Sequence, residues 1–512
     1  MSSNAVTLGD LYAQCLKRNG EAVAIIDGET QLTYFQLAER VGRIIGLFDE
    51  LGLSIGDRIG LAARMSADFI ACYMACHIAG IAVADMPPSM PADNLVHRVR
   101  SAGLTMVILE PAGIGGDVLA FAGTLTVPVL TTTPIDGLVC VNDAIKLIEP
   151  ATLFARPAPR CAAITYTGGS TGLSKAIAYD GAAGASIVLA HMAALPYPPH
   201  PISVVCRTSF PVMAYNVQPT LLRGGTLVTQ ADFDIDELYR LTVQHKANLL
   251  FMATQAIYTL VGRDDLVWPT GQLKLLFYGG EAINPSRLSI IVERLGPVLV
   301  GSYGCSEATS TVLLLPEDHD LSRPERISSL GRALLGVDIE MRDPQGNAVP
   351  AGDYGEITIR SPSHMLHYIG DPEKTAEVMT DHWVRTGDVG RMDDQGYIYI
   401  LDRLAFSFEA RGRAIYPRAI DLLLGDHPEV QSVATIGIPD PELSNRICAN
   451  VVRRNGSAIS ADELRSFARQ GDPRMEIDHI LFMDDLPKNP SNLKVDRRRL
   501  TELVLEHLAG EG

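Results

Sequence analysis

Short apolar runs alternate with longer amphipathic stretches up to about residue 335. The amphipathic stretches repeat their apolar residues at helical spacing and predict helices; the clearest are 33–51, 67–79 and 235–245. The apolar runs have the length of buried strands; they are 58–63, 106–110, 162–166, 202–206, 226–229, 248–252, 273–278 and 298–301. Strands that alternate with helices favour sheets covered by helices on both faces. The chain is therefore predicted to have an α/β fold.

The pattern changes after about residue 335, where apolar and polar residues alternate between Asp- and Gly-rich turn signals. Residues 340–343, 356–360 and 397–401 predict a small antiparallel β module within 335–402. From residue 403 the chain resembles a compact α+β unit, with helices at 417–425 and 461–470 and strands at 433–438 and 447–453. We therefore predict a large N-terminal domain, 1–402, and a small C-terminal domain, 403–512.

Composition and charge limit the partners of the chain. Among 512 residues, 43 are Lys or Arg and 60 are Asp or Glu, so the formal net charge is −17. This balance argues against a broad surface for nucleic acid or anionic lipid. The longest strongly apolar stretch, 70–84, is shorter than the ~20 residues of a membrane span and predicts a buried helix and strand. Eight scattered cysteines without CxxC spacing, and no visible secretory leader, predict reduced thiols and a cytoplasmic protein.

A segment rich in Gly, Ser and Thr directly follows the predicted strand 162–166. It runs Thr167, Gly168, Gly169, Ser170, Thr171, Gly172, Leu173, Ser174, Lys175. Glycines let the backbone approach a ligand closely, and the exposed N–H groups of such a loop bind anions. The hydroxyls add donors and the lysine adds charge, so the segment suits a triphosphate. Its spacing differs from the Walker pattern, and a flexible surface loop is the alternative for this segment taken alone.

This segment resembles the phosphate loop of the adenylate-forming superfamily, which includes acyl- and aryl-CoA synthetases, peptide-synthetase adenylation domains and luciferases. Four further segments resemble the remaining motifs of that family, in the same order. They are Tyr303-Gly304-Cys305-Ser306-Glu307, Trp383-Val384-Arg385-Thr386-Gly387-Asp388, Asp402-Arg403 followed by Gly412 and Pro417, and Pro487 through Lys494. Each motif is weak alone, but five in order are a specific signal for the family.

The resemblance implies ATP and Mg²⁺ as cofactors and gives the motif residues their roles. The loop, including Thr167, Gly168, Gly169, Ser170, Thr171, Gly172 and Lys175, would hold the β- and γ-phosphates. The adenine would lie between Tyr303-Gly304 and the wall formed by Gly279, Gly280 and Glu281. Asp388 would accept hydrogen bonds from the ribose hydroxyls, and Arg403 would contact the ribose or phosphate.

Three residues are implied to be catalytic: Thr171, Glu307 and Lys494. Glu307 would hold Mg²⁺, which prefers carboxylate and phosphate oxygens. Lys494 would bridge the carboxylate and the α-phosphate, where two anions meet and positive charge is needed. Because Lys494 belongs to a separate domain, the resemblance implies a mobile C-terminal domain that closes for adenylation and swings to a second pose for attack by a thiol.

The sequence departs from the family pattern at four positions. Ala176 replaces the usual Gly after the loop lysine, and Leu493 replaces the usual Gly before Lys494. Ala405 stands at the hinge, where Asp or Lys is usual, and Glu409 stands where Lys is usual. A hinge needs no charge to rotate. The changes nevertheless concern the part of the family pattern that serves thiol transfer, so adenylation is better supported than thioesterification.

The acyl pocket is predicted to involve Tyr215, Asn216, Phe277, Gly301 and Cys305. The window 206–225 lacks both the His common in acyl-CoA synthetases and the Asp that binds an α-amino group. An unpaired buried ammonium is costly, so an α-amino acid substrate is disfavoured. Residues 213–216 resemble the pocket of aryl-acid adenylating enzymes, although Tyr215 and Asn216 could equally be a core Tyr and a loop amide.

We therefore predict an ATP-dependent ligase that activates a small aryl or acyl carboxylic acid as its adenylate. The acceptor is predicted to be a thiol, either of CoA or of the phosphopantetheine of a carrier protein. Two alternatives stay open: an amine or other non-thiol acceptor, and a homologue that binds nucleotide without turnover. A dinucleotide-binding site at 113–116 is disfavoured because the required third glycine is missing. The sequence leaves the oligomeric state open.

Overall fold

The computed structural model describes residues 5–114, 116–167, 174–206, 212–269, 271–279, 283–471, 475–487 and 495–510. The chain divides into two compact units. Unit 1 comprises Met1–Ile339, Thr358–Thr386 and Gln395–Ile398. Unit 2 comprises Glu340–Ile357, Gly387–Asp394 and Tyr399–Gly512.

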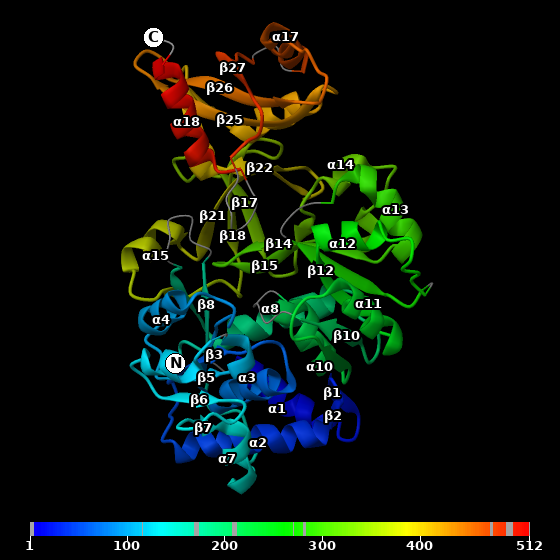
Figure 1. Cartoon of the computed structure of the whole chain (residues 1–512), viewed down its shortest axis with the longest axis vertical. Coiled ribbons are helices and arrows are strands. Elements are labelled where there is room, and N and C mark those ends of the chain that lie inside the picture. Colours follow the sequence, from blue (N-terminus) through cyan, green and yellow to red (C-terminus); the bar gives the residue numbers. More distant parts are fainter. Residues whose placement is uncertain are drawn as a thin grey trace. The chain divides into compact units, whose positions relative to one another are not determined.

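The first sheet of unit 1 has nine strands among the described residues (Figure 1). In spatial order they are β16 (Arg332–Ala333), β15 (Thr309–Leu314), β14 (Leu299–Cys305), β13 (Leu275–Gly279), β12 (Leu249–Ala253), β10 (Ile202–Val205), β11 (Thr226–Thr229), β1 (Val23–Asp27) and β2 (Thr30–Thr33). Strands β14 to β1 run parallel, and the edge strands are antiparallel. Strand β14 extends past the predicted end at residue 301 because its last residues pair with β15.

The second sheet of unit 1 has eight strands within the described ranges. In spatial order they are β19 (His367–Tyr368), β9 (Ala176–Tyr179), β8 (Ala163–Tyr166), β4 (Ala82–Asp85), β3 (Arg58–Ala62), β5 (Met106–Leu109), β6 (Val129–Thr131) and β7 (Val139–Cys140). Strands β8 to β7 run parallel, whereas β9 and β19 continue the sheet antiparallel.

Helices cover both faces of both sheets. The largest apolar core joins the two sheets to α1 (Leu8–Arg18), α2 (Tyr34–Glu50), α3 (Ala67–Ala79) and α8 (Gly181–Ala194). The other face of the first sheet is covered by α11 (Ile235–Gln244), α12 (Thr254–Val261) and α13 (Pro285–Leu295), which lie together in Figure 1. The other face of the second sheet is covered by α4 (Ala92–Ser101) and α6 (Val118–Gly123). Shorter helices are α5 (Pro111–Ile114), α7 (Val141–Ala144), α10 (Gln218–Leu222), α14 (Pro324–Ile327) and α15 (Pro372–Val378). The predicted α/β fold is confirmed.

The apolar stretch 70–84 forms the buried helix and strand that its composition predicts. Ser66 caps α3 by accepting a hydrogen bond from the Phe69 N–H at 3.2 Å. Gly80 ends the helix in the left-handed conformation, with φ of 71°. The chain then enters β4 in the centre of the second sheet. Across the part of the chain that the structure describes, none of the helices combines the length and apolar character needed to cross a bilayer.

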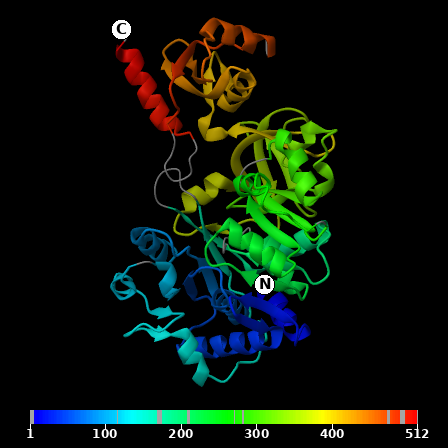
Figure 2. The ribbon, with the colours of Figure 1, turned by 45° about the vertical axis from the view of Figure 1, so that its right-hand side comes forward.

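The predicted antiparallel module is a five-stranded sheet among the described residues. It has the order β17 (Asp338–Arg342), β18 (Gly355–Arg360), β21 (Trp383–Met392), β20 (Met379–Thr380), and β22 (Ile398–Arg403) also pairs with β21. The C-terminal part of unit 2 has a sheet of β25 (Val430–Asp440), β26 (Ser444–Arg453) and β27 (His479–Met483). Helices α16 (Pro417–Gly425) and α17 (Ala461–Gly471) pack on one face, and α18 (Arg497–Gly510) packs on the other, as Figures 1 and 2 show.

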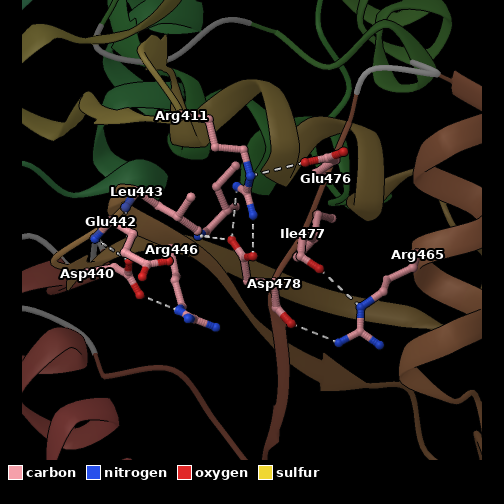
Figure 3. Close-up of polar contacts among 10 residues, drawn as sticks. Arg411, Asp440, Glu442, Leu443, Arg446, Arg465, Glu476, Ile477 and Asp478 are labelled. Carbon is pink, nitrogen blue, oxygen red and sulfur yellow. Dashed lines mark hydrogen bonds and ion pairs between the residues drawn. The ribbon is translucent and has the colours of Figure 1, made fainter.

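The hairpin of β23 (Phe408–Ala410) and β24 (Arg413–Ile415) is connected to the C-terminal sheet by ion pairs of Arg411 (Figure 3). Arg411, at the hairpin turn with φ of 54°, pairs with Asp478, and its Nε lies 3.1 Å from a Glu476 carboxylate oxygen. The Asp478 carboxylate also accepts a hydrogen bond from the Ile447 N–H at 2.8 Å. From α17, Arg465 donates to the backbone carbonyls of Ile477 and Asp478 at 3.1 and 3.0 Å. These contacts fix the hairpin and α17 to β26 and to the start of β27.

Three histidines of unit 1 have buried side chains. They are His77 on α3, His191 on α8 and His319 after β15. Burial lowers the pKa of each imidazole to about 4. They are therefore neutral in the folded state at neutral pH. Under mildly acidic conditions, the folded state binds fewer protons at these histidines than the unfolded chain does.

We expect H77Q to weaken the pH dependence of the stability of unit 1. An unfolded His binds a proton near pH 6.5, whereas His77 binds one only near its folded pKa of about 4. The unfolded state therefore binds more protons between these values, and stability falls as the pH drops through this window. Removing His77 should reduce that slope by about 1 kcal/mol per pH unit. Urea unfolding followed by fluorescence measures it, because both tryptophans of the chain, Trp268 and Trp383, lie in unit 1.

H200Q is the matched control, because His200 is exposed in the same unit. It should leave the slope unchanged even where it alters the stability itself. A slope in H77Q equal to that of the unsubstituted protein would contradict the assignment of His77 as a buried neutral imidazole.

Candidate functional site

The predicted phosphate loop connects the antiparallel strands β8 and β9. Its two ends are tied together: the Thr167 N–H donates to the Lys175 carbonyl at 3.0 Å, and the Lys175 N–H donates to Thr167 Oγ1 at 3.2 Å. The structure thus brings these two predicted residues together and fixes the backbone from which the Lys175 side chain extends. Gly168, Gly169, Ser170, Thr171 and Gly172 lie outside the described residues.

Lys175 has a carboxylate partner that the sequence analysis did not identify. Its Nζ lies 2.7 Å from Asp371 Oδ2. Asp371 is the N-cap residue of α15 and accepts the Lys374 N–H at 2.9 Å. The Asp371-Pro372 sequence carries the signal of a helix start, but nothing in it points to Lys175, which is 196 residues away.

Glu307 lies in the connection between β14 and β15, next to the β19 segment. Its carboxylate accepts a hydrogen bond from the Tyr368 hydroxyl, and its backbone carbonyl accepts the Met365 N–H at 2.7 Å. Tyr368 is buried, with 3% of its surface exposed, and burial raises the pKa of its hydroxyl well above the usual value. Tyr368 therefore remains a hydrogen-bond donor that holds the carboxylate in place. No motif in the sequence pointed to this contact, because Tyr368 lies 61 residues after Glu307.

The glycine of the Tyr303-Gly304-Cys305-Ser306-Glu307 motif is explained by a close backbone contact. A Cβ atom on Gly304 would lie 1.7 Å from the Thr309 carbonyl oxygen. Thr309 has a positive φ of 61°, so the chain turns sharply after Glu307. The hairpin of β14 and β15 can close around Glu307 only if residue 304 has no side chain.

The predicted adenine wall lies at the carboxyl ends of two neighbouring parallel strands. Gly279 ends β13 and pairs with Ser302 of β14, directly before Tyr303. The carboxyl ends of parallel strands are the usual ligand-binding edge of such sheets. Gly279 and the Tyr303-Gly304 pair therefore share one sheet edge. Gly280 and Glu281 lie outside the described residues.

Aromatic side chains cluster at the residues predicted for the acyl pocket, and Tyr215 and Phe277 are both part of the largest apolar core. The rings of Tyr215 and Phe277 stack with centroids 4.7 Å apart and an interplanar angle of 15°. Phe251 and His191, which the sequence analysis did not identify, lie 5.6 and 5.9 Å from the Tyr215 ring. Tyr215 belongs to the π-helix η2 (Met213–Val217), a form that is rare and frequent at functional sites.

Asn216 is also on η2 and is completely buried. Its side-chain oxygen accepts a hydrogen bond from Ser203 Oγ. Among the described residues its amide nitrogen has no hydrogen-bond partner. The structure thus makes Asn216 a buried amide within a helix, rather than a loop residue.

The structure shows the local surroundings of Gly301 and Cys305, the two remaining residues predicted for the pocket. A Cβ on Gly301 would lie 2.8 Å from Tyr278 Oη and 3.1 Å from Leu314 Cβ, so this glycine makes room for Tyr278. Cys305 is a free thiol at the end of β14, and burial raises its pKa above the usual value. Their roles in a substrate pocket stay predictions.

Asp388 and Arg403 lie together in unit 2, on the paired strands β21 and β22. Arg403 Nε lies 2.7 Å from Asp388 Oδ1. The Asp388 side chain is buried, whereas the Arg403 side chain is 58% exposed. Gly387 directly before Asp388 has φ of 70°, which favours glycine. Lys494 and Leu493 lie outside the described residues, and Ala405 lies in the short 3₁₀ helix Leu404–Phe406.

This fold, with a Gly-rich loop ending at a lysine and a carboxylate at the carboxyl edge of the adjoining sheet, is that of a nucleotide-binding ligase. The family model of AMP-binding enzymes matches residues 12–369, and the model of the AMP-binding enzyme C-terminal domain matches residues 419–492. The chain belongs to the family of AMP-binding enzymes, which confirms the resemblance to adenylate-forming enzymes.

Individual relatives are more distant. The chain is 28% identical over 465 residues to the medium/long-chain-fatty-acid–CoA ligase FadD8 of Mycobacterium tuberculosis, a match that covers 88% of this chain and 80% of that protein. It is 29% identical over 518 residues to a feruloyl-CoA synthase of an Amycolatopsis species, covering 96% and 98% of the two chains. Among solved structures, the amide bond synthetase McbA from Marinactinospora thermotolerans aligns with a TM-score of 0.84 at 26% identity, over 97% of this chain and 99% of that one.

We expect G304A to destabilise unit 1 strongly. The added methyl group would meet a backbone carbonyl that cannot move without opening the β14–β15 hairpin. Overpacking of this kind costs typically 1–3 kcal/mol or more. Urea unfolding followed by tryptophan fluorescence measures the loss.

G123A is the matched control, because a Cβ at Gly123 on α6 meets no atom within 4 Å. This substitution should leave the stability within about 0.5 kcal/mol of the original value or raise it slightly. Equal stabilities of the two variants would show that residue 304 does not need to be glycine.

Proposed function

We propose that this chain is an ATP-dependent ligase that activates a small aryl or acyl carboxylic acid as its acyl-adenylate. The observation that carries the proposal is the segment 365–371 of unit 1. It contacts both Lys175, the proposed phosphate-binding cation, and Glu307, the proposed magnesium ligand. A cation and a carboxylate supported from one short segment suit a bound triphosphate with its metal ion.

In the first step a carboxylate oxygen of the acid attacks the α-phosphorus of ATP. The bond from this phosphorus to the oxygen that bridges the α- and β-phosphates breaks, and pyrophosphate leaves. Lys175 and the hydroxyls of Thr167, Ser170 and Thr171 would hold the leaving phosphates. Lys494 would bring positive charge to the meeting point of the two anions. Asp388 would bind the ribose, and Arg403 would contact the ribose or a phosphate.

The residues present fit a magnesium ion bound together with the nucleotide. Glu307 offers carboxylate oxygens, and Mg²⁺ is usually held by one or two carboxylates together with substrate phosphates. Within the described ranges, no group of three or more His, Cys, Asp or Glu side chains forms a metal cage. When bound, the ion would neutralise charge on the phosphates.

The aromatic cluster around Tyr215 supports an acid with an apolar or aromatic body. Tyr215 and Phe277 are buried in the largest apolar core and Phe251 packs against it, so an acid bound at this place would be surrounded by aromatic rings. The sequence from 206 to 225 contains no Asp or Glu that could pair with an α-ammonium group. The feruloyl-CoA synthase relative, by its name, acts on an aromatic acid.

The second step would pass the acyl group to a thiol, either of CoA or of a carrier-protein phosphopantetheine. The sulfur attacks the carbonyl carbon of the adenylate, the thiol loses its proton, and AMP leaves. The names of the CoA-ligase relatives support this acceptor. We propose that residues 403–512 form the mobile domain that carries Lys494, while residues 1–402 hold ATP and the acid.

An amine acceptor is the second candidate, favoured by one specific observation. The solved structure of an amide bond synthetase aligns with this chain at a TM-score of 0.84 over 97% of its length. The unusual hinge residue Ala405 supports the same candidate. In this case an amine nitrogen would attack the same carbonyl carbon, lose a proton and form an amide as AMP leaves.

All eight cysteines lie within the described residues and are free thiols. Free thiols suit a reducing compartment, which supports our proposal that the reaction takes place in the cytoplasm.

A screen of acid-dependent ATP–pyrophosphate exchange tests the proposed activation step. Aryl, short-chain and medium-chain acids are supplied in turn, and we expect exchange with at least one class. K494A should lower that exchange by about 10²–10³-fold, as expected for a group that stabilises developing charge. K146A is the control, because Lys146 is 71% exposed and pairs with Asp143 on the surface.

Exchange that is equally fast in K494A would remove Lys494 from the proposed mechanism. ATP binding without exchange on any acid would instead identify the chain as a nucleotide-binding homologue without turnover.

Supplying the acceptors separately distinguishes the two second steps. After the acid is activated, CoA, a phosphopantetheinylated carrier protein and a primary amine are each added alone, and the products are identified by mass spectrometry. We expect a thioester with CoA or the carrier. An amide as the sole product, formed at a rate that depends on the enzyme, would establish the amine acceptor instead.

A further inference from the structure

Two backbone contacts hold Lys175 and Asp371 at neighbouring positions. Lys175 is fixed at the end of the phosphate loop by its hydrogen bonds with Thr167 and by the start of β9 at Ala176. The Ile369 N–H donates to the Ala176 carbonyl at 2.9 Å, and Tyr368 of β19 pairs with Ile177. The backbones that carry the two side chains are therefore joined by one sheet, and the movable part is the four-carbon stem of the lysine.

The Asp371 carboxylate is fixed in turn by its capping role. Its Oδ1 accepts the Lys374 N–H at 2.9 Å, which leaves Oδ2 for Lys175 Nζ at 2.7 Å. The pKa of Asp371 is lowered mainly by the hydrogen bond from Lys175 and next by the one from the Lys374 backbone. Asp371 therefore remains ionised at neutral pH. The neighbouring Lys374 side chain pairs with Glu377. Asp371 thus presents a charged, oriented acceptor to Lys175.

We propose that Asp371 is a positioning residue that competes with the phosphate chain of ATP for Lys175. The ammonium group leaves the carboxylate when a triphosphate binds and returns to it when pyrophosphate departs. This inference rests on the proposed function, which assigns the β- and γ-phosphates to Lys175. No covalent bond changes in the exchange; one ion pair replaces another.

The exposure of the pair permits this exchange. The Lys175 and Asp371 side chains are 48% and 33% exposed, and Asp371 borders an open hollow of about 340 Å³. Ion pairs of this exposure are weak, because water screens them. A triphosphate carries more negative charge than one carboxylate, so it can displace Asp371. The displacement nevertheless weakens the binding of ATP by the strength of the lost pair.

The substitution D371N tests the competition, because asparagine keeps the N-cap hydrogen bond and removes the charge. Isothermal titration calorimetry measures the dissociation constants of α,β-methylene-ATP, which cannot release pyrophosphate, and of AMP, both with Mg²⁺. We expect D371N to bind α,β-methylene-ATP two- to fivefold more tightly, about 0.4–1 kcal/mol. Its affinity for AMP should not change, because AMP lacks the phosphates assigned to Lys175.

Two further variants separate this role from a general effect. In the K175A background, D371N should give no gain, since the group under competition is missing. D117N is the control for the loss of a capping charge, because Asp117 caps α6 in unit 1 in the same manner. It should bind both nucleotides like the unsubstituted protein.

The outcomes distinguish the inference from the proposed function. A gain of equal size in the K175A background, an equal change for AMP, or weaker binding of α,β-methylene-ATP by D371N would each overturn the competition. Failure of the unsubstituted protein to bind either nucleotide would instead contradict the proposed function itself.

Discussion

The antiparallel pairing of β9 with β19 is the contact on which the candidate site depends. Tyr368 pairs with Ile177 and His367 with Ala178, so a segment far along the chain becomes the edge strand beside the phosphate loop. This pairing sets Asp371 against Lys175 and Tyr368 against Glu307 at the same time. A slip of one residue in its register would turn these side chains to the opposite faces. The geometry of two charged groups is thus set by one pair of short strands.

Among the described residues, the charged groups assigned to the nucleotide or its metal ion have protein partners. Lys175 pairs with Asp371, Glu307 accepts a hydrogen bond from Tyr368, and Asp388 pairs with Arg403. The partners differ in burial, however. Tyr368, the partner of Glu307, is nearly inaccessible to solvent, whereas Asp371 and Arg403 are partly or largely exposed. A buried partner fixes a group because an unpaired charge in the interior is costly, and an exposed partner can be exchanged.

The sequence allowed the fold class and many individual elements to be predicted. The amphipathic stretch 67–79 is α3, and the predicted helices at 33–51 and 235–245 correspond to α2 and α11 within one residue at each end. Periodicity predicts such elements because each buries one face.

In the candidate site, the proximity of Thr167 and Lys175 could be predicted from the sequence, because these residues close one short loop. Tyr368 and Asp371 could not, since their contacts arise only from the pairing of β9 with β19. The stacking of Tyr215 on Phe277 and the π-helix that presents Asn216 likewise depend on packing between distant segments.

The short connection between Tyr368 and Asp371 has a consequence for how such sites diverge. It consists of Ile369 and Gly370, and Gly370 turns the chain with φ of 74°. Insertion or deletion of a single residue there would keep β19 on the sheet edge and Tyr368 at Glu307, yet carry the aspartate out of reach of the lysine. The spacing of these two residues therefore matters as much to the Lys175–Asp371 contact as their identity. Under the proposed competition, homologues with a longer or shorter spacer would keep Tyr368 at Glu307 and differ in how tightly they hold ATP.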